Sequence, residues 1–161
     1  LFRLSEEVAE VDFVVKLHRK DKREYYEEAA NQFPNHRLIL VDSSSAELPT
    51  GILSWFQGCT GVLTGSSNVA VEAMLLNVPV ITMDYTGILA EGVSFIDDHA
   101  TLHAFGFDEL KAAVKRVVNS DGEVKLLRER AEQFVQDMYY KMDGRAVSRC
   151  VAGILDLRQS D

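Results

Sequence analysis

The sequence predicts an α/β fold in three layers, built on a doubly wound, mostly parallel sheet. Three observations favour this class. Short apolar segments of strand length alternate with amphipathic segments of helix length, the chain closes with long helical patterns, and segment 60–84 has the order of a βαβ unit. In that segment an apolar strand, a polar turn, a helix and a second strand beginning at Pro79 follow one another.

Length and composition favour one domain with a substantial core. The chain has 161 residues and 47% hydrophobic content, which is too short for two full domains, so we expect residues 1–161 to form one. The net charge of −8 argues against nucleic acid or an anionic membrane surface as the main partner. No apolar stretch has the length of a transmembrane helix and the first residues do not resemble a signal peptide, so we expect a cytoplasmic protein.

The cysteines and acidic residues do not predict a metal site. Cys59 and Cys150 lie far apart without metal-site spacing, and we expect both to be buried, reduced thiols. Asp97, Asp98 and His99 are adjacent, so they cannot all point at one ion. We expect neither a metal nor a cofactor.

The first part of the chain contains two predicted helix–strand pairs. These are a helix over 1–10, a strand over 12–17, an amphipathic helix over 22–33 and a strand over 37–41. A polar loop over 42–49 and a short helix follow. The chain opens inside a helix without an initiating Met, so we expect it to be the C-terminal part of a longer chain.

A basic cluster follows the first predicted strand. Lys16 lies near the end of this strand and His18 follows its carboxyl end, where open parallel sheets bind ligands. His18 can donate to a phosphate, and its charge can change near neutral pH. The alternative for the neighbouring Arg19 and Lys20 is a charged loop exposed to water.

The turn Gly65-Ser66-Ser67 is the strongest candidate site. A strand ends and a helix begins there, so free backbone N–H groups and the positive end of the helix dipole converge on any anion. Glu72 lies four residues after Asn68, on the same side of the helix, and its carboxylate would accept hydrogen bonds from hydroxyls. The pair predicts a ligand with a phosphate and a diol, such as a nucleotide ribose. A well-capped structural helix with a solvated Glu is the alternative.

The second half of the chain adds a loop, a strand and three helices. The loop 84–92 contains Tyr85 and two glycines that permit close backbone approach. The predicted elements are a strand over 93–96, helices over 108–118 and 123–140, and a last helix over 145–157 whose apolar side faces inward.

Five segments, in order along nearly the whole chain, resemble the C-terminal, nucleotide-binding half of GT-B glycosyltransferases. The similarity is to the UDP-N-acetylglucosamine 2-epimerase group and to the capsule and surface-polysaccharide transferases. The segments are Val15-Lys16-Leu17-His18, Gly61-Val62-Leu63-Thr64-Gly65-Ser66-Ser67, Glu72-Ala73-Met74-Leu75, Pro79-Val80-Ile81 and Asp143-Gly144-Arg145-Ala146.

This resemblance implies a Rossmann-like domain in which the turn holds the diphosphate of a nucleotide-sugar and the helix Glu binds ribose hydroxyls. The family's Lys-x-His-Pro element has Arg19 where Pro is usual, so a catalytic role of His18 stays open. The substrate-binding residues that we expect are Lys16, His18, Gly65, Ser66, Ser67, Asn68, Glu72 and Tyr85.

The implied function is binding of a UDP- or CMP-type donor in a metal-independent glycosyltransferase that acts on a cell-surface glycan. In this family the acceptor and the general base commonly come from the N-terminal half. That half is therefore the expected partner, and any peripheral membrane contact is expected through it. A UDP-N-acetylglucosamine 2-epimerase and a non-catalytic nucleotide-binding or scaffolding module are the alternatives.

Overall fold

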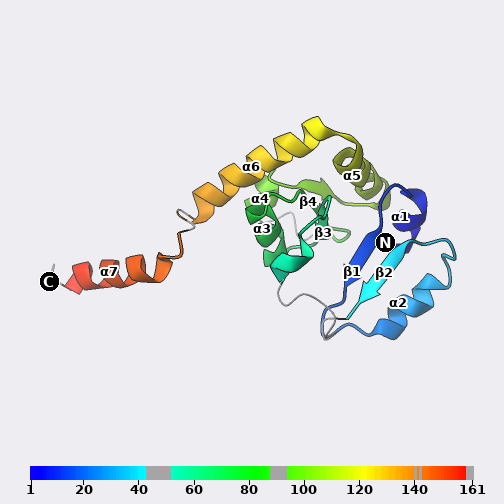
Figure 1. Ribbon diagram of the computed structural model, residues 1–161, viewed down its shortest axis with the longest axis horizontal. Coiled ribbons are helices and arrows are strands. Elements are labelled where there is room, and N and C mark those ends of the chain that lie inside the picture. The colour runs from blue at the N-terminus through cyan, green and yellow to red at the C-terminus, as the bar shows by residue number, and fades with distance from the viewer. Residues whose placement is uncertain (43–51, 88–93, 140, 142, 159–161) are drawn as a thin grey trace.

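The computed structural model of the chain describes residues 1–42, 52–87, 94–139, 141 and 143–158 (Figure 1). The helices are α1 (Phe2–Glu7), α2 (Arg23–Ala30), α3 (Asn68–Leu75), α4 (Ser94–Asp97), α5 (Phe107–Asn119), α6 (Asp121–Tyr139) and α7 (Ala146–Arg158), with a 3₁₀ helix η1 (Ile52–Trp55). The strands are β1 (Phe13–Lys16), β2 (Leu38–Val41), β3 (Val62–Thr64), β4 (Val80–Met83) and β5 (Leu102–Ala104).

The strands form two parallel sheets, which confirms a mixed α/β fold. One sheet contains β1 and β2, and the other has the order β3-β4-β5. The predicted βαβ unit is confirmed, because β3 and β4 are parallel neighbours joined by α3. The register places Phe13 opposite Leu38, Val62 opposite Val80, and Ile81 opposite Leu102.

One prediction about the region after β4 is wrong, and one strand there was not predicted. Segment 93–96 was expected as a strand, but residues 94–97 form the short helix α4, and the strand β5 lies at 102–104, where none was predicted. A short apolar run suits a buried helical turn as well as a strand. Here Phe95 packs edge-on against Phe134 of α6, with ring centroids 6.2 Å apart, which fixes the helical turn in the core. The loop positions 43–49 and 88–92 lie outside the described residues.

The three-stranded sheet has core residues on both faces. Side chains alternate along each strand, so Val62 and Val80 lie on one face and Leu63 and Ile81 on the other. Residues of α3, α4 and α6 pack on the first face, and residues of α1 and α5 pack on the second. The middle strand β4 is therefore buried from both sides.

The two-stranded sheet is covered much less completely. No residue of α2 is buried, and Val14 and Ile39 are 51% and 54% exposed. A cavity of about 480 Å³ extends between α2 and β1, with Val15, Tyr26 and Leu38 in its lining. This half of the molecule holds little of the core.

The last helix contradicts its prediction. We expected the apolar side of α7 to face inward, but Val147, Val151, Ile154 and Leu155 are all at least half exposed. Figure 1 shows α7 extending away from the two sheets. The spacing predicted the helix correctly, but an amphipathic pattern does not say which surface it contacts. The burial predicted for Cys59 and Cys150 is also wrong, because both free thiols are exposed.

Candidate functional site

The turn between β3 and α3 is ordered by Ser67. Its backbone is extended (φ −129°, ψ 145°), and its hydroxyl oxygen accepts a hydrogen bond from the N–H of Val69 at 3.3 Å, as an N-cap does. The N–H of Ser67 itself donates to the carbonyl of Gly65 at 3.0 Å. Within the described residues, the N–H groups of Ser66 and Asn68 have no partner. Of the predicted anion donors, the N–H groups of Ser66 and Asn68 thus have no partner in the described residues, whereas the N–H of Ser67 is used to hold the turn.

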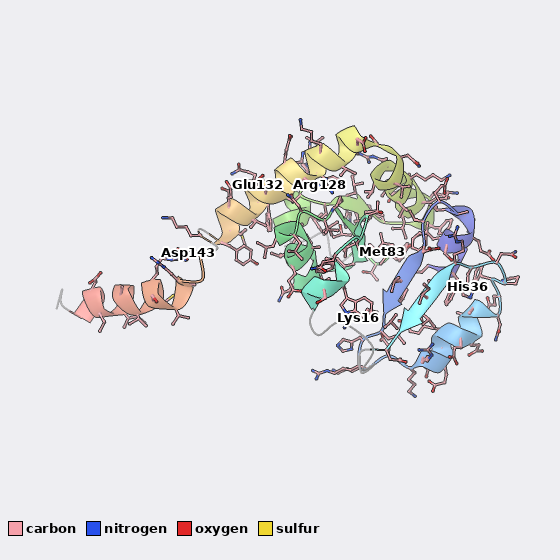
Figure 2. The ribbon with its side chains drawn as sticks, in the orientation of Figure 1. Lys16, His36, Met83, Arg128, Glu132 and Asp143 are labelled. Carbon is pink, nitrogen blue, oxygen red and sulfur yellow. The ribbon has the colours of Figure 1, made fainter. Side chains whose placement is uncertain are left out.

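Helix α3 is anchored at both ends. Ala70 and Ala73 are fully buried, and small side chains at these positions let the helix lie close to the sheet and to α6. At its C-terminal end Asn77 has a positive φ of 63°, and its carbonyl accepts a hydrogen bond from Nε of Arg128 at 2.8 Å. Figure 2 shows Arg128 on α6, so the helix that carries the candidate site is fixed to the longest helix.

Glu72 lies on the side of α3 opposite its buried residues. A rotation of about 100° per residue puts Glu72 near Asn68 and roughly opposite the buried Ala70 and Met74. The side chain is partly buried, and no hydrogen bond or ion pair joins it to any residue that the structure describes. Its carboxylate can therefore accept hydrogen bonds from a ligand beside the first turn. The turn is not blocked, since Ser66 and Asn68 are exposed.

The carboxyl end of β4 lies beside that of β3 and brings Tyr85 to the same edge of the sheet. Asp84 is 1% exposed and accepts hydrogen bonds from the N–H and the hydroxyl of Thr86, at 3.1 and 2.9 Å. Its own N–H donates to Ala104 at 2.9 Å. Tyr85 is 59% exposed, and desolvation of its hydroxyl raises its pKa. A buried acid thus shapes the turn that presents an exposed aromatic ring.

Lys16 and His18 belong to the other sheet. Both are exposed at the end of β1, where Figure 2 labels Lys16. The N–H of His18 donates to Asp21 at 2.8 Å, and its Nδ1 accepts from the N–H of Lys20 at 3.2 Å. One ring nitrogen of His18 thus closes a turn and Nε2 is left for a ligand. Within the described residues, no hydrogen bond or ion pair joins either residue to the turn at Ser67.

A polar cluster that we did not predict lies between β4 and β5. The hydroxyl of Thr82, which is fully buried, is 2.9 Å from Nδ1 of His103, 3.1 Å from the hydroxyl of Thr101 and 3.3 Å from the carbonyl of Leu102. Nε2 of His103 is buried and has no partner in the described part of the chain. The strand β5 was not predicted, so nothing in the sequence placed this histidine beside Thr82.

The segment before α7 is held by Asp143. Nη1 of Arg149 donates to both carboxylate oxygens of Asp143, at 2.7 and 2.9 Å, and the N–H of Arg145 donates to one of them at 3.0 Å. These bonds, with that of Arg149 the strongest, lower the pKa of Asp143. Gly144 has a φ of 70°, which favours glycine. The Asp-Gly-Arg-Ala segment therefore begins a helix.

The described residues contain no group of three or more His, Cys, Asp or Glu side chains suited to a metal ion. Among them, no helix has the length and apolar character needed to cross a bilayer. Comparison of the chain with protein-family models, with curated proteins and with solved structures gives no match.

Proposed function

We propose that this chain is the donor-binding domain of a glycosyltransferase that moves a sugar from a nucleotide-sugar to a cell-surface glycan acceptor. One observation carries the proposal. Within the part of the chain that the structure describes, the N–H groups of Ser66 and Asn68 in the turn before α3 have no partner, and neither has the Glu72 carboxylate one helical turn further on. Because Asn68 and Glu72 are four residues apart on one side of the helix, with Cβ atoms about 5–6 Å apart in such a pair, donors for a diphosphate lie near an acceptor for ribose hydroxyls.

The proposal includes the arrangement of the two sheets. We take them as parts of one doubly wound, three-layer sheet, the Rossmann-like half of a GT-B fold, in which the chain order reverses between β1 and β3. Ligands bind at such a reversal, outside the carboxyl ends of the strands. Lys16 and His18 end one strand and the Gly65 turn ends the other, so both sides of the crevice carry groups that suit a diphosphate.

These groups fit the chemistry of sugar transfer. When the bond between the anomeric carbon and the diphosphate oxygen breaks, negative charge develops on the diphosphate. Backbone donors at a helix N-terminus and the ammonium group of Lys16 would stabilise that charge without a metal. Tyr85 would contact the base or the sugar. The acceptor and the general base would come from an N-terminal domain of the same protein.

Calorimetric titration tests the site. We expect one of UDP, CMP, CDP and GDP to bind to residues 1–161 with a Kd on the order of 1 mM, about −4 kcal/mol, because half of the cleft is absent. Glu72→Ala should weaken binding about tenfold, since it removes hydrogen bonds to a charged group. Glu28→Ala removes an exposed acid on α2 and should change nothing. Equal affinities for Glu72→Ala and wild type would remove the ribose role.

The reaction class needs the full-length protein. Consumption of a nucleotide-sugar only in the presence of a glycan acceptor would support transfer. Consumption of UDP-N-acetylglucosamine without any acceptor would identify an epimerase instead. Nucleotide binding without turnover under both conditions would leave a non-catalytic binding module.

A further inference from the structure

The cavity between α2 and the β1-β2 sheet has an apolar interior. Val15 of β1 and Leu38 of β2 line it from the sheet, and Ala29 lines it from α2. Its volume of about 480 Å³ lies in the range of small-molecule sites. Side chains alternate along a strand, so the side chain of Lys16 points to the opposite face of β1 from Val15. The cavity and Lys16 thus belong to different faces of this sheet.

The wall that α1 contributes to the cavity is fixed in place. The buried hydroxyl of Ser5 donates to the carbonyl of Phe2 at 2.8 Å and accepts from the N–H of Arg37 at 3.2 Å. The ring of Phe2, which lines the cavity, packs edge-on against His36 with ring centroids 5.0 Å apart. A ligand would therefore not have to order this wall, which reduces the entropy cost of binding.

The apolar side of α2 faces the cavity and is only partly covered. Tyr26 and Ala29 line the cavity, and no residue of this helix is buried. A bound apolar group would remove the surface of these side chains from water, which is favourable. Three lining residues, Phe2, Tyr25 and Tyr26, are aromatic, and aromatic side chains contact ring systems well. The interior therefore suits one or two rings.

The mouth of the cavity has an excess of positive charge. Lys20 and Lys22 line it and are exposed, and neither ammonium group has a carboxylate partner among the described residues. The carboxylate of Asp21 already accepts from the N–H of His18 at 2.8 Å and from the hydroxyl of Tyr26 at 3.3 Å. One engaged carboxylate thus stands beside two ammonium groups that can bind an anion.

We propose that this cavity binds an amphiphilic anion, in which one or two rings occupy the apolar interior and a carboxylate or phosphate lies at the two lysines of the mouth. The exposed ring of Tyr25, 5.6 Å from Nζ of Lys22, would lie beside the ligand where its two parts join. The proposal rests on the cavity alone and does not depend on nucleotide binding at the Ser66 turn.

Calorimetric titration of the protein with three probes tests the proposal. We expect 2-naphthoate, which has both a ring system and an anionic group, to bind with a Kd on the order of 0.1 mM. The neutral 2-naphthamide should bind about tenfold more weakly, because it lacks the charge. Acetate, which lacks the rings, should not bind at millimolar concentration. Equal affinities for 2-naphthoate and 2-naphthamide, or no binding of 2-naphthoate, would overturn the proposal.

A charge variant tests the mouth of the cavity. The double variant Lys20→Gln/Lys22→Gln should weaken binding of 2-naphthoate about tenfold and leave that of 2-naphthamide unchanged. Lys115→Gln, at an exposed position of α5, makes the same chemical change far from the cavity lining and should alter neither. If 2-naphthoate binds the double variant as tightly as the wild type, the proposal is wrong.

A larger side chain tests the interior. Ala29→Trp puts an indole ring into the cavity and should abolish binding of both naphthalene probes. Glu28→Trp, at an exposed position of the same helix, should not. Circular dichroism checks that both variants are folded, and the lysine variants decide if Ala29→Trp is not. Unchanged binding by folded Ala29→Trp would contradict the proposal.

A ¹H–¹⁵N correlation spectrum locates the bound probe. On titration with 2-naphthoate the amides of Val15, Ala29 and Leu38, which line the cavity, should shift most. Shifts confined to α7, which also exposes apolar side chains, would place the probe elsewhere and overturn the proposal.

Discussion

The two sheets differ in what covers them. In the β3-β4-β5 sheet both faces contact helices, and Val80 and Ile81 are almost completely buried. In the β1-β2 sheet Val14 and Ile39 are more than half exposed, and α2 has no buried residue. Apolar strands of the same length thus contribute very differently to the core. The apolar residues of a strand determine how much surface it could bury, but the neighbouring helices determine how much of that surface is buried.

The largest expected effect is a core deletion that compares the two sheets. Ile81→Ala should lose about 2–5 kcal/mol of unfolding free energy, because it leaves a cavity between α1, α5 and the sheet. Ile39→Ala makes the same chemical change at an exposed position and should lose less than about 1 kcal/mol. Urea denaturation measures both. Similar losses would mean that Ile39 is buried in solution.

The second largest loss of stability is expected from the polar cluster around Thr82, in the β3-β4-β5 sheet. Thr82→Val keeps the side-chain volume but removes the hydroxyl that contacts Thr101 and Nδ1 of His103. Thr101 and His103 would then lose a hydrogen-bond partner in the core, which should lower the unfolding free energy by about 1–3 kcal/mol. Thr60→Val, at an exposed position before β3, is the control and should be close to neutral. A neutral Thr82→Val in urea denaturation would mean that water satisfies the cluster.

The cap of α3 should have a smaller effect. Ser67→Ala removes the acceptor of the Val69 N–H and should cost about 1 kcal/mol. Ser66→Ala, at the exposed neighbouring position, should not change stability. Thermal denaturation followed by circular dichroism measures both. If the two variants are equally stable, Ser67 does not cap the helix.

The smallest effect concerns the contact between α1 and α5. Glu7 accepts hydrogen bonds from Lys111 at 2.8 Å and Arg3 at 2.7 Å, and these lower its pKa. A group with a lowered folded-state pKa stabilises the protein above its unfolded pKa, and this stability is lost as the pH falls through the folded pKa. Lys111→Met should make stability less dependent on pH in this acid range. Unfolding free energies measured between pH 3 and pH 7 that show an unchanged slope would exclude the contact.

Much of the fold could be predicted from periodicity. The βαβ unit, the helices over 107–119 and 121–139 and the strands before residue 42 lie where the spacing of apolar residues indicated. The strand β5 could not be predicted, because three residues with a histidine in the middle have no clear period. The exposure of α7 could not be predicted either. Its apolar residues at helical spacing indicate a helix with one apolar side, but not which surface that side contacts.

The sequence predicted those features of the candidate site that depend only on residues close together in the chain. Ser67 caps α3, and Glu72 shares a side with Asn68, because both relations depend only on spacing along one helix. The buried Asp84 and the contact of Thr82 with His103 depend on which strands are neighbours, so the sequence did not reveal them. Whether Lys16 acts with the turn depends on the arrangement of the two sheets and stays a prediction.

One measurement tests the proposed nucleotide site most directly. In a ¹H–¹⁵N correlation spectrum of residues 1–161 titrated with UDP and, separately, with CMP, the amides of Ser66 and Asn68 should shift most. Their N–H groups have no partner among the residues described by the structure, so a bound diphosphate or phosphate should be their acceptor. Uridine without phosphate should not shift them. If neither nucleotide moves these two amides at millimolar concentration, the turn is a structural cap and the donor-site proposal is wrong.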